Sequence, residues 1–112
     1  MEELSVIRTT YEVHKKLAEL NASLNQKYRH TLSEPAVGHC QATLVQLILA
    51  KHAPKSMKKP HLLQAEAEAE LTALLLRTML ELHLANETNL LKLQAKLSEA
   101  RRQISGWRKS VQ

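Results

Sequence analysis

The sequence predicts an all-α protein, either a helical hairpin or a three-helix bundle with a long C-terminal coiled-coil helix. The first indication is the scarcity of turn residues, because the 112 residues include only two glycines and three prolines. A β-sandwich or barrel needs many more turn residues than this. The second is the composition, in which hydrophobic residues make up 44% and aromatic residues only 3%. The third is apolar spacing of helical period. The length fits one domain over residues 1–112.

A first helix is expected over about residues 2–32. Its apolar residues alternate steps of four and three, which is one face of a helix and close to a heptad repeat. This stripe consists of Val6, Thr10, Val13, Leu17, Leu20 and Leu24. The segment Ser33-Glu34-Pro35 ends this helix, and a second helix is expected over about 36–52. Proline is well tolerated in a first helical turn.

A basic linker is expected over residues 53–60. Pro54 and Pro60 bound it, and Lys55, Lys58 and Lys59 lie between them. Nothing in this segment can contribute to a core.

A third helix is expected over about 61–108, a length of about 70 Å at about 1.5 Å per residue. It contains the stretch AEAEAELTALLLRTMLELHL, from Ala65 to Leu84. The alternation at its start has the period of a strand, but Ala and Glu favour helices. Arg77, Glu81 and His83 interrupt the apolar run, so no membrane span is predicted.

The long helix carries an apolar seam, which we interpret as a partner interface. A helix of this length would outrun the shorter helices, and an exposed apolar seam usually marks a binding surface. Its two polar members, His83 and Asn86, either set register and partner choice or face solvent beside the core. Trp107 either anchors the interface or caps the bundle. The predicted interface residues are Leu76, Met79, His83, Asn86, Leu90, Leu93, Leu97, Ala100, Ile104 and Trp107.

No catalytic residue, cofactor site or metal site is predicted. The six histidines include no pair four residues apart, and Cys40 is the only cysteine, so a zinc ligand set is missing. His39 precedes Cys40 directly and would point about 100° away on a helix, which leaves the thiol without a base. No glycine-rich phosphate loop or nucleophile elbow is present. The chain is therefore not expected to be an enzyme.

The net charge of +5 and the isoelectric point near 9.6 leave an anionic partner open. No aromatic residues alternate with the basic ones, and no known DNA-binding motif accompanies them. The alternative interpretation is that they are solvated helix ends and a solvated loop. The candidate anion contacts are Lys55, Lys58, Lys59, Arg101, Arg102, Arg108 and Lys109.

These observations predict a non-enzymatic interaction subunit or adaptor. It would assemble through the coiled-coil helix into a larger helical complex, with another helical chain or with a second copy of itself. The alternative is a basic helical module that binds nucleic acid or an acidic filament surface. A single cysteine allows no internal disulfide, and the acidic N-terminus is unlike a secretion signal. An intracellular location, cytoplasmic or nuclear, is therefore expected.

Overall fold

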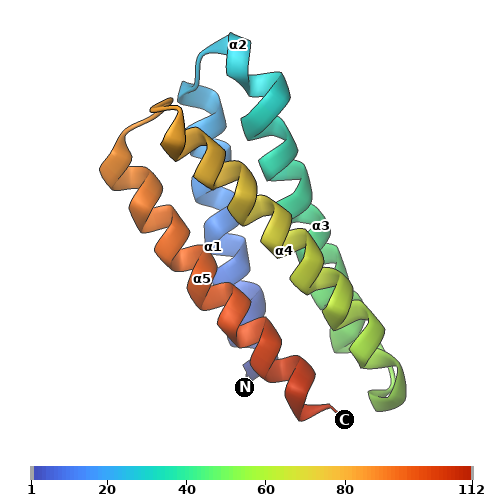
Figure 1. Ribbon diagram of the computed structural model, residues 1–112. Coiled ribbons are helices and arrows are strands. Elements are labelled where there is room, and N and C mark those ends of the chain that lie inside the picture. The colour runs from blue at the N-terminus through green and yellow to red at the C-terminus, as the bar shows by residue number, and fades with distance from the viewer. Residues whose placement is uncertain (1, 112) are drawn as a thin grey trace.

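A computed structural model describes the backbone of residues 2–111 and the side chains of residues 5–111. Within this range the chain forms four long helices that run alternately up and down (Figure 1). They are α1 (Glu2–Ser23), α3 (Glu34–His52), α4 (Lys58–Glu81) and α5 (Glu87–Ser110). Each helix packs against the next along the chain, and α5 closes the ring against α1. The resulting bundle measures 44 × 22 × 19 Å. The all-α class is confirmed, but the bundle has a fourth long helix.

The first helix is shorter than the predicted 2–32, because α1 ends at Ser23. Asn25 then caps a single turn, α2 (Gln26–Tyr28), by accepting a hydrogen bond from the Lys27 backbone N–H at 2.9 Å. A π-helical turn, η1 (Arg29–Ser33), leads directly into α3. The Arg29 Nε donates to the Leu24 carbonyl at 3.1 Å, which ties this turn back to the end of α1.

The connection between α3 and α4 is short and lies within the predicted basic linker. It contains one 3₁₀ turn, η2 (Lys55–Met57), and α4 already begins at Lys58. Pro60 lies in the first turn of α4, where its missing N–H leaves no helical bond unmade. The Lys58 ammonium donates to the carbonyls of Ala50 at 2.7 Å and Lys51 at 3.2 Å. Carbonyls in the last turn of a helix lack helical partners, so this lysine caps α3.

The prediction of one continuous helix over 61–108 is wrong, because the chain reverses between α4 and α5. His83 has a φ of 55°, in the left-handed region. The His83 N–H donates to the Leu80 carbonyl and the Leu84 N–H to the Met79 carbonyl, both at 3.1 Å. These two bonds form a Schellman motif at the end of α4. Asn86 then caps α5 by accepting from the Asn89 N–H at 2.9 Å.

The core runs along the centre of the bundle. It consists mostly of leucine and alanine, with valine, threonine and the single residues Met79, Ile104 and Trp107. Alanines such as Ala65 and Ala69 are buried between the helices and let their backbones approach closely. Buried threonine hydroxyls are satisfied within their own helices: Thr10 donates to the Val6 carbonyl at 2.8 Å and Thr72 to the Glu68 carbonyl at 2.8 Å. Among the described residues, no buried hydroxyl group is left unpaired.

The alternation at the start of the AEAEAE stretch now has a structural explanation. Ala65 and Ala69 face the core. Glu66 pairs with Arg108 of α5. The Glu68 Oε1 lies 2.6 Å from the His39 Nδ1 of α3, within hydrogen-bond distance. Successive glutamates of one helix therefore bind the two neighbouring helices and fix their register against α4.

Replacement of His83 by glycine is expected to stabilise the protein by about 0.5–1 kcal/mol, because glycine adopts a positive φ without steric cost. Glu99→Gly, at an exposed position inside α5, is the control and should destabilise by about 1 kcal/mol. Urea denaturation of both variants measures the difference. Equal destabilisation by the two glycines would show that His83 is not left-handed in solution.

Candidate functional site

The seam predicted to bind a partner lies inside the bundle. Of its ten residues, His83 and Asn86 are exposed and form the reversal between α4 and α5. The other eight are buried by other helices of the same chain. These are Leu76, Met79, Leu90, Leu93, Leu97, Ala100, Ile104 and Trp107.

The reversal after Glu81 explains why the residues of the predicted interface are buried. It lays α5 between α1 and α4, so the chain itself covers the apolar stripe of α5. An ion pair and a hydrogen bond join α1 and α5. The Lys96 ammonium lies 3.2 Å from the Glu12 carboxylate, and the Gln103 Nε2 donates to the Ser5 hydroxyl at 3.5 Å. His83 ends α4 and Asn86 begins α5, and the Trp107 side chain is buried in the core.

Among the described residues, six of the ten exposed large apolar side chains lie on α3 and α4. Val45, Ile48 and Leu49 follow one another at steps of three and one, on the face of α3 opposite its buried residues. They are 52%, 46% and 44% exposed. The outward face of α4 adds a second group of leucines, which are between 38% and 50% exposed: Leu63, Leu71 and Leu74. We call these six residues the outer apolar face.

Sequence reasoning missed the outer apolar face for a physical reason. A stripe around a helix can be read from the sequence, but which stripe faces the core depends on the neighbouring helices. On α3 the apolar residues surround most of the helix, and the buried positions are the smaller residues Ala36, Cys40, Thr43 and Ala50 together with Leu47. The larger side chains of this helix are therefore partly on the outside.

The candidate anion contacts fall into three groups. Lys58 and Arg108 are used inside the fold, the first as the cap of α3 and the second as the partner of Glu66. Arg101 and Arg102 line a surface hollow on α5 together with Glu66 and Glu70 of α4.

Lys55, Lys59 and Lys109 are exposed. Lys55 and Lys59 lie in one segment, the α3–α4 connection with the first turn of α4, and Lys109 lies in the last turn of α5. Figure 1 shows that these two segments lie at the same end of the bundle. We call Lys55, Lys59 and Lys109 the basic end.

Cys40 is buried, and its Sγ lies 3.8 Å from the Thr10 carbonyl oxygen. Burial raises the pKa of this thiol from 9.0 to about 12, because the thiolate would lose its hydration. The reactive form is the thiolate, so the folded chain protects Cys40 from oxidation and alkylation. Among residues 5–111, no three histidine, cysteine or carboxylate side chains are grouped as metal ligands would be.

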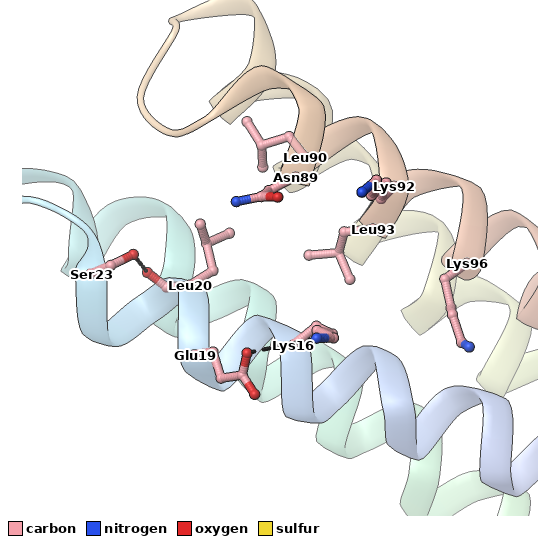
Figure 2. A pocket seen from close by; sticks show the side chains of 9 residues that line it. All are labelled: Lys16, Glu19, Leu20, Ser23, Asn89, Leu90, Lys92, Leu93 and Lys96. Atoms are coloured by element: carbon pink, nitrogen blue, oxygen red, sulfur yellow. Dashed lines mark hydrogen bonds and ion pairs between the residues drawn. The ribbon is translucent and has the colours of Figure 1, made fainter.

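A hollow opens on the surface between α1 and α5, with a volume of about 480 Å³ (Figure 2). Leu20 of α1 and Leu93 of α5 point toward each other across it, and the Asn89 amide points into it. Lysines and one glutamate surround this apolar floor. The lining residues are Lys16, Glu19, Leu20, Ser23, Asn89, Leu90, Lys92, Leu93 and Lys96.

No protein-family model, curated protein or solved structure matches this chain. None of the described helices combines the length and the hydropathy needed to cross a bilayer.

Leu97→Ala is expected to destabilise the protein by about 2–5 kcal/mol, since Leu97 is 2% exposed inside the bundle. Leu91→Ala, on the same helix but at a residue that is 49% exposed, should change stability by about 0.5 kcal/mol or less. Chemical denaturation at a concentration where the protein is monomeric measures both. If Leu97→Ala were neutral in the monomer, the seam would not be the core of the single chain.

Proposed function

We propose that this protein is a non-enzymatic interaction subunit, which binds another helical protein or a second copy of itself through the outer apolar face of α3 and α4. The observation that supports this proposal is the grouping of exposed apolar side chains. Single exposed leucines are ordinary on protein surfaces, whereas several large apolar side chains on the outward faces of two adjacent helices are typical of binding surfaces.

The geometry of the α3–α4 pair favours a helical partner. Hydrogen bonds from His39 to Glu68 and from His61 to Gln46, at 2.6 and 2.9 Å, hold the two helices in register along their length. The residues of the outer apolar face lie on the sides of α3 and α4 that face away from the core. A rigid pair of parallel ridges is suited to receive a third helix, whose side chains would pack into the groove between them.

Val45→Glu and Ile48→Glu are expected to abolish assembly while leaving the helical content unchanged, because both residues are about half exposed in the single chain. A buried interface at either position would contain an unpaired carboxylate, and each variant should weaken association by more than about tenfold. Light scattering behind a sizing column, over a range of concentrations, gives the assembly state, and co-purification gives any partner.

The matched control is Tyr11→Glu, which places the same charge at a similarly exposed apolar residue of α1, outside the outer apolar face. It should assemble as the unmodified protein does. The proposal fails if Val45→Glu and Ile48→Glu keep the assembly and the partner of the unmodified chain, or if the unmodified chain is a stable monomer without a partner.

A second candidate function is the binding of a polyanion, nucleic acid or an acidic filament surface, by the basic end. What favours it is that two segments far apart in the sequence bring exposed lysines to one end of the bundle. Such binding would be electrostatic and would not read sequence, because lysines contact phosphates as point charges.

The double variant Lys55→Glu and Lys59→Glu should weaken binding to a DNA duplex and reduce the salt slope of log K by about 2, since each lost phosphate contact contributes about 0.9. Lys15→Glu combined with Lys16→Glu makes the same change of charge on α1 and is the control. Fluorescence anisotropy at several salt concentrations measures the slope. Equal losses in the two double variants would mean that net charge alone, and not the basic end, attracts the duplex.

A further inference from the structure

The hollow between α1 and α5 has the size and lining of a small-molecule site. Its volume of about 480 Å³ falls in the range of about 300–1,000 Å³ that ligand pockets have. The floor consists of Leu20, Leu90 and Leu93, and Leu90 and Leu93 are 0% and 6% exposed. An apolar group that entered it would contact side chains that already belong to the core.

The rim of the hollow is positively charged. Three lysines and one glutamate give its lining a net charge of +2. Lys16 is only loosely paired with Glu19, at 3.9 Å with both side chains exposed, and Lys92 has no ion-pair partner among residues 5–111. The Asn89 side-chain amide points into the hollow and makes no hydrogen bond to the described residues. Donors therefore surround an apolar floor, which suits a carboxylate joined to an apolar body.

The shape of the hollow favours a compact ligand over a docked helix. The lining covers two turns of each helix, about 11 Å at about 1.5 Å per residue. The ion pair between Glu12 and Lys96 crosses from α1 to α5 at 3.2 Å and lies at one end of this lining. A helix that continued along the α1–α5 groove would have to break this pair.

From the lining, the charge and the closed end, we infer that the hollow between α1 and α5 binds a small amphipathic carboxylate with an aliphatic body. The carboxylate interacts with Lys92, Lys16 and the Asn89 amide, and the aliphatic body lies on Leu20 and Leu93. This site shares no residue with the outer apolar face or with the basic end. It can therefore be tested independently of the proposed function.

Titration of the isotopically labelled full chain with sodium decanoate below its micellar concentration tests this inference by NMR. The expected result is saturable shifts confined to residues 16–23 and 89–96. Decyltrimethylammonium, which has the same chain length and the opposite charge, should not produce them. Shifts that do not saturate, that are equal for the two amphiphiles or that lie on the outer apolar face would overturn the assignment.

Variants of the residues that line the hollow test whether the positive charge of its rim binds the carboxylate. Glu19→Gln removes the one carboxylate of the lining and should tighten decanoate binding, while Lys92→Glu should weaken it roughly fivefold. Lys109→Glu makes the same change of net charge at the basic end and should leave the affinity unchanged. Ser23→Trp fills the hollow from an exposed position and should prevent binding. Equal effects of Lys92→Glu and Lys109→Glu would reduce the interaction to net charge and would also overturn the site.

Discussion

The reversal between α4 and α5 is the constraint on which the rest of the structure depends. Without it, the residues from Lys58 to Ser110 would form one helix with an apolar stripe much longer than α1 or α3. The left-handed residue His83 ends α4, the Asn86 side chain begins α5, and five residues separate the two helices. Because α5 then runs back along α1, its leucines become the core of a single chain.

This internal covering changes which surface can have a function. In a bundle of four amphipathic helices, each helix uses one stripe for the core, and any further apolar residue must face outward. The outer apolar face of α3 and α4 is such a surplus. The basic residues divide in a similar way, because Lys58 and Arg108 hold helices in place while the basic end remains exposed. A residue type alone therefore does not separate structural from functional roles in this chain.

The sequence predicted the helical class, the apolar stripe of α1, the position of the basic linker and the membership of the α5 stripe. It did not predict where that stripe would be covered. Glycine and proline are the usual signals of a helix end, and the reversal contains neither. A signal was nevertheless present: Asn86 followed by Glu87 is a favourable helix start, and histidine tolerates a positive φ better than most residues do. The outer apolar face could not be predicted, because α3 is apolar on several sides and only packing selects the buried one.

The order in which the helices contact one another also has a consequence for how the chain folds. Three of the four helix pairs join neighbours in the sequence, and only the pair α1–α5 joins distant segments. Local contacts form early, since they cost little loop-closure entropy, whereas the α1–α5 contact has to wait for both hairpins. We expect the α1–α5 seam to be the last to close and the first to open, so slow hydrogen exchange should be concentrated in α3 and α4.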